Sequence, residues 1–349
     1  MTYASTATSM PSVKGETALA ENKHYETAKV VDLKAFKRKL EVIRYTPEQL
    51  KLDLGVVSPP LQDLFFSPVF LFQTCLPMRE PKLSELINGA YVRRNGDLVM
   101  EIRSTEGPHC LPWGKFPRQF LMWLTNAVKR YPDSLNAEGH FCLQGSYREF
   151  CRSVGVNSSS GANGSGRKLL GQVNRLMTTT FTFKKGDELS AKRGQRSTKH
   201  FAVSTELNLA WDEQSSRPKE WMDNLGGSFK LSRDFCEEIR EHAFPVDARH
   251  LALVCAGKSP LRIDVYHWAH YRVGYYHRND RPATEVPWTA LHGQFGTHGS
   301  IYEFVRQFTD ELRWIQENVW RDLHWTVKDN GSLLLHKVEP TVEIRRRFR

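Results

Sequence analysis

The feature that most constrains the fold is an amphipathic helix followed directly by an extended run, within residues 166–183. The predicted helix at 166–178 carries a buried stripe at helical spacing, formed by Leu169, Leu170, Val173, Leu176 and Met177. Threonine and phenylalanine then alternate at 180–183, which predicts a strand with one face against a core. A charged tip at 184–199 follows, and residues 200–209 predict a single returning strand. This order indicates a helix packed beside a β-hairpin.

Two further helices are predicted upstream of that unit. Residues 116–130 are apolar on one face and carry Pro117 in the first turn, where proline is tolerated. Residues 146–154 form a shorter helix, with Ser146 and Glu149 at the spacing of a capping box. Three helices followed by a hairpin is the order of a winged helix, in which the third helix enters the major groove of DNA.

The second half of the chain repeats this plan. Helices are predicted at 232–242, 247–256, 260–276, 287–295 and 300–319, and Gly296 and Gly299 mark the turn between the last two. Residues 322–328 and 333–338 predict a second hairpin around the turn at 329–332. The expected fold is therefore α+β, mostly helical, with two tandem winged-helix domains.

These elements divide the chain into five expected parts. A mobile N-terminal arm spans 1–45. An extension at 46–110 contains a hairpin around Asn95 and Gly96 and packs on the first domain. The first winged-helix domain covers 111–215, the second covers 216–340, and residues 341–349 form a basic C-terminal tail.

Positive charge is concentrated in the first of these domains. The whole chain has a formal net charge of +10. Residues 111–211 hold 15 Lys and Arg against 6 Asp and Glu, whereas residues 217–340 hold 16 against 17. A positive field confined to one domain is typical of a protein that neutralises backbone phosphates.

The candidate DNA contacts follow from the helix faces and hairpin tips. On the helix at 166–178, the face opposite the apolar stripe offers hydrogen-bond donors and no acid. The hairpin tip and the helix at 300–319 supply the others, although Glu303, Asp310 and Glu317 could pair with the arginines of that second helix. The predicted DNA-binding residues are Ser165, Arg167, Lys168, Gln172, Arg175, Lys184, Lys185, Arg193, Arg196, His298, Tyr302, Arg306 and Arg313.

Motifs spread over about residues 70–338 resemble those of the plasmid-encoded RepA replication initiators. The motifs are Leu111-Pro112-Trp113-Gly114 with Pro117-Arg118, the helix at 164–177, Lys258-Ser259-Pro260-Leu261, Asp264-Val265-Tyr266 with Trp268, Trp288, Leu291, Gln294-Phe295-Gly296 and the closing hairpin. The loop at 157–166 is longer and richer in glycine than the family pattern, and the basic tip around Arg193 is an individual feature.

The resemblance implies a function and partners. It implies tandem winged-helix units that bind repeats in double-stranded plasmid origin DNA, open the duplex nearby and recruit the host replication initiator and helicase machinery. It also implies a switch between a monomer and a homodimer that represses its own gene. Such a protein would work in the cytoplasm on the plasmid, with no membrane contact, cofactor, metal or catalytic residue.

Two alternatives remain open at this stage. A winged-helix transcriptional repressor would bind the same kind of DNA without opening it. A rolling-circle initiator would nick one strand with a tyrosine and needs closely spaced metal-binding histidines, but no H-x-H occurs in the sequence. Asp264, His267 and His270 mimic a metal site at helical spacing beside Tyr271, although ordinary packing is favoured.

Other chemical motifs are near misses. Residues 252–259 formally satisfy a relaxed phosphate-loop pattern, but only one glycine is present and Pro260 removes a donor at the start of the next helix. Residues 161–166 lack the required Lys and Ser or Thr. The six cysteines are scattered without a C-x-x-C and are expected to be reduced thiols.

Overall fold

The structure is a computed structural model of the chain. It describes residues 30–32, 64–130, 140–144, 151, 154–156, 164–186, 197–209, 227–296 and 299–342. Several predictions lie outside these residues: most of the arm at 1–45 and of the helix at 146–154, the side chains of Arg193, Arg196 and His298, and all but two residues of the tail. The described part is an α+β fold, as expected.

Helix α4 (Lys115–Arg130) is the central helix of the first half. Its apolar face is fully buried, including Phe120, Leu121 and Leu124. It packs against α6 (Ser165–Met177), β2 (Leu64–Pro68) and α9 (Arg233–Glu241). The predicted helices at 116–130, 166–178 and 232–242 are therefore confirmed to within one or two residues at each end.

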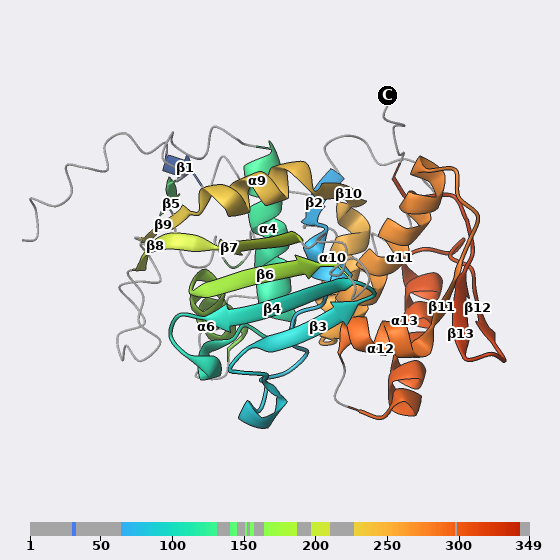
Figure 1. The fold of residues 1–349 in the computed structure, drawn as a ribbon. Helices are drawn as coiled ribbons and strands as arrows, with labels where there is room; N and C mark the ends of the chain where they lie inside the picture. The colour runs from blue at the N-terminus through green and yellow to red at the C-terminus, as the bar shows by residue number, and fades with distance from the viewer. Residues whose placement is uncertain are drawn as a thin grey trace, which may run out of the picture.

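An antiparallel sheet of strands β3, β4, β6 and β7 covers α6 and α3 (Phe70–Gln73) (Figure 1). Its strands are β3 (Tyr91–Asn95), β4 (Leu98–Ser104), β6 (Thr179–Lys185) and β7 (Ser197–Ala202). The predicted hairpin is confirmed, but its turn lies one residue later than expected. Asn95 still belongs to β3 and pairs with Leu98, so Gly96 and Asp97 form the turn, in which Gly96 has a positive φ of +60°. Phe70 lies 5.3 Å from Phe181 between ring centroids and joins the sheet to the core.

The sequence predicts one returning strand at 200–209, and this prediction is wrong. The structure divides it into β7 and β8 (Ser204–Leu209), which belong to different sheets. At the break, Val203 donates its N–H to the Thr179 carbonyl, and Ser204 Oγ donates to the Lys230 carbonyl. Strand β8 then pairs with β9 (Gly227–Leu231), beside β5 (His140–Gln144) and β1 (Val30–Asp32). Alternation continues across the break, so the sequence pattern does not reveal it.

The second half is built around α11 (Pro260–Arg278), which packs against α13 (Ile301–Asn318) and α10 (Ala248–Ala256). Asp247, Ser259 and Ser300 cap α10, α11 and α13 with their side-chain oxygens. Helix α12 (Trp288–Phe295) ends at Gly296, which has a φ of +62°. The predicted helices of this half are confirmed.

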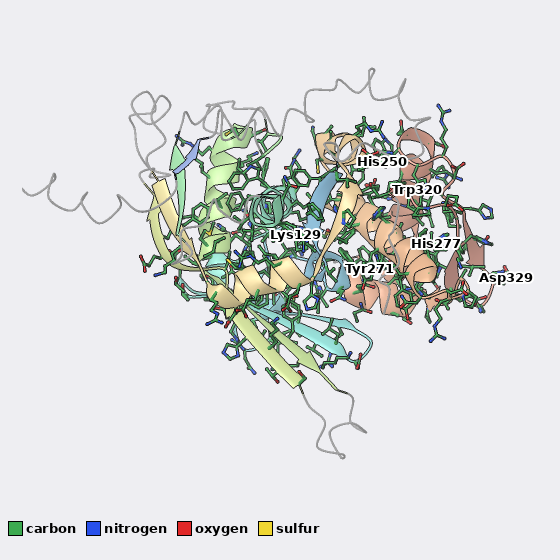
Figure 2. All side chains as sticks on the ribbon, turned by 90° about the horizontal axis from the view of Figure 1, so that it is seen from above. Lys129, His250, Tyr271, His277, Trp320 and Asp329 are labelled. Atoms are coloured by element: carbon green, nitrogen blue, oxygen red, sulfur yellow. The ribbon has the colours of Figure 1, made fainter. Side chains whose placement is uncertain are left out.

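A small antiparallel sheet closes the chain at the outer end of this half (Figure 1). It consists of β11 (Glu285–Pro287), β13 (Ser332–Leu335) and β12 (Trp325–Lys328). The β12–β13 hairpin was predicted and β11 was not. Figure 2 shows Asp329, in the turn of this hairpin, at the outer edge of the molecule, beyond His277 of α11.

The two halves share one continuous hydrophobic core. Strand β2 pairs along its length with β10 (Ala243–Asp247), so a segment before residue 111 is hydrogen-bonded to one after residue 216. Two short 3-10 turns, η4 (Leu83–Glu85) and η5 (Pro108–Cys110), lie in the segment that leads into α4. This packing places three elements around one hollow: helix α6, the first residues of α4 and the first residues of α11.

Candidate nucleic-acid interface

The apolar side chains of α6 are buried in the core, so only the opposite face of this helix remains accessible. Leu169, Leu170, Val173, Leu176 and Met177 are all buried in the core, as predicted. The opposite face lines a hollow of about 1020 Å³ that we call the α6 hollow. The predicted residues on this wall are Ser165, Arg167, Lys168, Gln172 and Arg175.

Two of these residues hold the chain in place beside α6. The buried Gln172 accepts the Trp113 backbone N–H at 2.8 Å through its side-chain oxygen. Arg175 Nη1 donates to the His109 carbonyl at 2.9 Å and pairs with Glu80 Oε1 at 3.0 Å. Both therefore bind the segment that leads into α4. Lys168 is exposed and Arg167 half-exposed, and no carboxylate of the described residues pairs with either.

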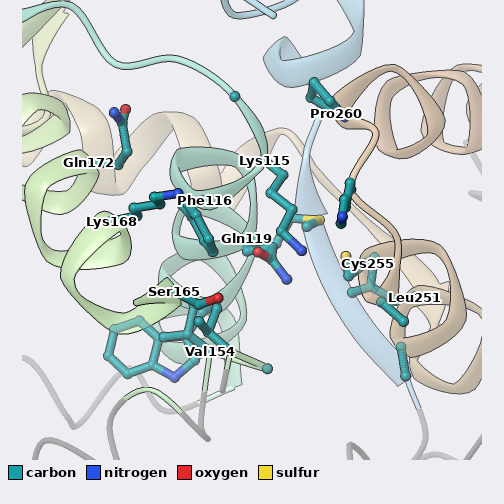
Figure 3. Close-up of a pocket in the computed structure, with 18 of the residues that line it drawn as sticks. Lys115, Phe116, Gln119, Val154, Ser165, Lys168, Gln172, Leu251, Cys255 and Pro260 are labelled. Carbon is teal, nitrogen blue, oxygen red and sulfur yellow. The ribbon is translucent and has the colours of Figure 1, made fainter. Parts of the chain in front are cut away.

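The rest of the α6 hollow is lined by side chains of α4 and by residues of α10 and the start of α11 (Figure 3). Lys115, at the start of α4, donates to the Gly257 carbonyl at 2.9 Å, and the exposed Lys258 precedes α11. Five cationic side chains thus line the hollow, and no Asp or Glu is among the described residues that line it. Burial lowers the pKa of Lys115, and the nearby charge of Lys258 lowers it further.

The sequence analysis did not include Lys115 and Lys258 among the DNA contacts. Lys258 was considered there within a phosphate-loop near miss and within a motif that carries the RepA resemblance. The structure places that segment between two helices, α10 and α11, and Ser259 caps α11 through the Arg262 N–H. A phosphate loop follows a strand, so this segment is not one. The available signal was that both lysines stand at the start of a helix, where anions are favoured.

The β6–β7 hairpin extends from the same half of the molecule. Lys184 and Lys185 lie at its exposed end, and Lys184 pairs with Glu101 of the neighbouring strand β4. On β7, Lys199 pairs with Glu238 of α9 at 2.6 Å. Lys185 is exposed, and no ion pair among the described residues offsets its charge.

Helix α13 carries the remaining predicted contacts. Tyr302 is 84% exposed near its start. Arg306 pairs with Glu303 at 2.6 Å and with Asp310 at 3.3 Å, and Arg313 pairs with Asp310 at 3.0 Å. Hydrogen bonds from Arg306 lower the pKa of Glu303. Glu303 and Asp310 therefore form the intrahelical pairs that the sequence allowed, whereas no ion pair of Glu317 is found among the described residues.

The apparent metal pattern on α11 is a set of packing residues. Asp264 pairs with Arg118 at 2.7 Å, and His267 hydrogen-bonds through Nδ1 to the Ile263 carbonyl at 2.6 Å. His270 contacts the Pro245 carbonyl at 2.9 Å through Nε2. Among the residues that the structure describes, no group of three His, Cys, Asp or Glu side chains could hold a metal ion. No described helix is long and apolar enough to cross a membrane.

The α+β fold gathers five cationic side chains around α6, of which Arg167 and Lys168 have no carboxylate partner among the described residues. A cationic surface of this kind is typical of proteins that bind polyanions. Comparison with known families makes the class specific. The family described as "Plasmid encoded RepA protein" matches residues 111–290, just over half of the chain. The chain belongs to this family of plasmid replication initiators.

Solved structures and curated sequences add little to this assignment. A crystal structure of a selenomethionine derivative of domains 2 and 3 of RctB is similar at 14% identity, with a TM-score of 0.43 over 84% of this chain and 99% of that one. A second structure of RctB domains 2–3 has a TM-score of 0.38 at 14% identity, over 70% of this chain and 88% of that one. No curated protein matches the sequence.

Proposed function

We propose that this protein initiates plasmid replication by binding double-stranded origin DNA sequence-specifically and opening the duplex nearby. The observation that carries the proposal is the cationic wall of the α6 hollow, on which Arg167 and Lys168 have no carboxylate partner among the described residues. Unpaired cations beside an amphipathic helix favour phosphates and the acceptor edges of bases. Membership of the RepA family supports the same function.

The proposed reading units are two winged helices. In the first, covering 111–215, α6 is the recognition helix and the β6–β7 hairpin is the wing, with Lys184, Lys185, Arg193 and Arg196 along the DNA backbone. In the second, covering 216–340, α12 and α13 form the helix-turn-helix and β12–β13 the wing. The order of elements supports this assignment, since a hairpin follows the last helix in each unit.

The second unit is proposed to supply base discrimination more than bulk affinity. Its residues are nearly neutral as a set. Tyr302 is free to approach DNA, whereas Arg306 and Arg313 must exchange their carboxylate partners for DNA acceptors. Ser165, the first residue of α6, and His298, which precedes α13 in the sequence, complete the proposed contacts. Two helices in successive major grooves would cover about two helical turns, with half-sites about 10 bp apart.

Further partners follow from the family's mode of action. We propose that the DNA-bound protein recruits the host replication initiator and helicase in the cytoplasm, and that a homodimer represses its own gene while a monomer starts replication. Sedimentation of the full chain with and without origin DNA tests the switch. Two species with different masses are expected, and one species under both conditions would contradict it.

Permanganate footprinting of a supercoiled plasmid carrying the origin tests the function. We expect reactive thymines in an AT-rich segment beside the bound site. Protection of the site without reactive thymines would identify a repressor. A denaturing gel of the same samples detects a covalent tyrosine adduct, which would identify a nicking enzyme. Either of these two outcomes would overturn the proposal.

A further inference from the structure

The α6 hollow has features that contact with a duplex surface does not require. Lys115, Arg167 and Lys168 of the first half line it together with Lys258 of the second half. Like charges repel, so four cations kept together without a lining carboxylate favour a bound anion. The hollow also lies at the start of α11, a 19-residue helix, and the start of a helix favours negative charge.

The floor of the hollow is apolar. Its lining includes the side chains of Phe116, Met122, Val156 and Leu251. A volume of about 1020 Å³ is at the upper end of the range of small-molecule sites, which is about 300–1,000 Å³. An apolar floor under a cationic rim suits a ligand with a flat apolar body and a charged end.

Among the residues that line the hollow, buried polar atoms without a hydrogen-bond partner include Gln119 Oε1 and Trp113 Nε1. Gln119 is 5% exposed, and its Oε1 has no hydrogen-bond partner in the structure. Figure 3 shows the Gln119 side chain lining the hollow beside Lys115. Buried carbonyl oxygens in proteins are nearly always hydrogen-bonded, so an unpaired one marks a place for a donor. A planar base offers such a donor from its ring or exocyclic N–H. Gln119 Oε1 is closed to solvent in this structure, so the Gln119 side chain must turn toward the hollow to accept it.

We propose that the α6 hollow binds a nucleotide, with its phosphates among Lys115, Lys258, Arg167 and Lys168 and its base on the apolar floor, donating to Gln119 Oε1. Two sources share this chemistry: a free nucleoside phosphate, or one unstacked nucleotide of a DNA strand. The site needs both halves of the chain, because Lys115 and Lys258 come from different sides of residue 216. It does not depend on α6 reading duplex DNA.

Calorimetric titration of the full chain tests the site. The probes are deoxyadenosine triphosphate, inorganic tripolyphosphate, and a single-stranded (dA)10 oligonucleotide with a 5′ phosphate. Lys115→Gln/Lys258→Gln is expected to weaken nucleotide binding at least tenfold. Lys328→Gln/Lys337→Gln, which removes two cations from the outer sheet region, is the matched control and is expected to bind like the wild type.

The probes distinguish the sources. Binding of deoxyadenosine triphosphate that the Lys115→Gln/Lys258→Gln variant loses identifies a free nucleotide, and loss confined to the oligonucleotide identifies a nucleotide of a strand. Either result supports the site. Equal binding by the wild type and this variant, or tripolyphosphate binding as tightly as the nucleotide, would overturn it. Duplex binding measured in parallel shows separately whether the proposed function fails.

A second variant tests the role of the base. Gln119→Leu removes the unpaired acceptor, so the empty protein should melt at the same or a higher temperature. The same change should lower affinity for deoxyadenosine triphosphate several-fold while leaving tripolyphosphate binding unchanged. A variant that melts as expected and keeps full nucleotide affinity would contradict the placement of the base.

Discussion

Arg118 of α4 and Asp264 of α11 form a fully buried bidentate ion pair between the two halves of the protein. Arg118 Nε and Nη2 donate to the two carboxylate oxygens at 2.8 and 2.7 Å. The same guanidinium donates to the carbonyls of Leu76, Pro77 and Gly114 at 2.6–3.1 Å. Arg118 thus fixes the start of α11 relative to the start of α4, and with it the position of Lys258 opposite α6.

Breaking this pair from one side is expected to destabilise the fold strongly. Arg118→Met leaves a buried carboxylate without its partner, and the free energy of unfolding should fall by about 3–5 kcal/mol. Arg118→Met/Asp264→Leu should lose less of the free energy of unfolding than Arg118→Met, because neither buried charge remains. Lys337→Ala, which breaks an exposed pair with Asp280, should cost no more than about 1 kcal/mol. Urea unfolding measures all three, and a neutral Arg118→Met would refute the account of the pair.

Buried histidines of the second half predict acid sensitivity. Burial lowers the pKa of His250 and of His267 to about 4, and that of His270 to about 3. In the unfolded chain these residues protonate near pH 6.5, whereas the folded form keeps them neutral. Below pH 6.5 the unfolded state therefore binds more protons and is favoured.

For each of these histidines, the free energy of unfolding is expected to fall by up to about 1.4 kcal/mol for each pH unit below pH 6.5. Urea unfolding at pH 7, 6 and 5 should show stability falling by several kcal/mol over this window. His270→Gln should make the dependence shallower, since one of the three groups no longer titrates. A stability that is flat from pH 7 to pH 5 would show that the histidines are not held neutral.

Binding to origin DNA is expected to depend strongly on salt, because cations of the first half displace counterions from phosphates. If about six phosphate contacts form, affinity should fall roughly a thousandfold between about 50 and 200 mM salt. Fluorescence anisotropy with a labelled origin duplex measures this directly. A flat response would rule out the electrostatic basis of the interface.

Arg306→Ala tests the second recognition helix. The residue already has carboxylate partners in Glu303 and Asp310, so its contribution to bulk phosphate attraction is small. We expect relaxed base preference in one half of the footprint and a nearly unchanged salt slope. Selection from randomised DNA provides the readout. A variant that keeps the wild-type preference in both halves would remove α13 from the reading surface.

Local patterns in the sequence predicted the helices well. The spacing of apolar residues along the sequence was enough to predict the buried faces of α4, α6 and α13. Gly96 and Gly296 mark turns in which the glycine has a positive φ. Pairings over long distances were not predictable in this way. Strand β2 pairs with β10 about 180 residues later, and the break at Val203 separates two sheets within one alternating run.

The candidate site shows the same division. The exposed face of α6 follows from its apolar stripe, so Arg167 and Lys168 were identified. The helical stripe does not show that Gln172 is held by the Trp113 backbone or that Arg175 is tied to Glu80, because both partners come from the segment before α4. Lys115 and Lys258 are brought to α6 only by the packing of α4 against α11, which includes the Arg118–Asp264 pair.

The central claim is that the exposed face of α6 carries origin recognition. The most direct measurement is the affinity of Arg167→Ala/Lys168→Ala for an origin duplex and for a scrambled duplex across a salt series. Arg175→Ala is a separate comparison, since it also removes the ties to Glu80 and His109 and should lower stability. The account predicts that the double variant folds normally and loses about 1–3 kcal/mol of origin affinity for each base contact removed, with a shallower salt slope. Unchanged origin affinity and an unchanged slope in the folded double variant would contradict it.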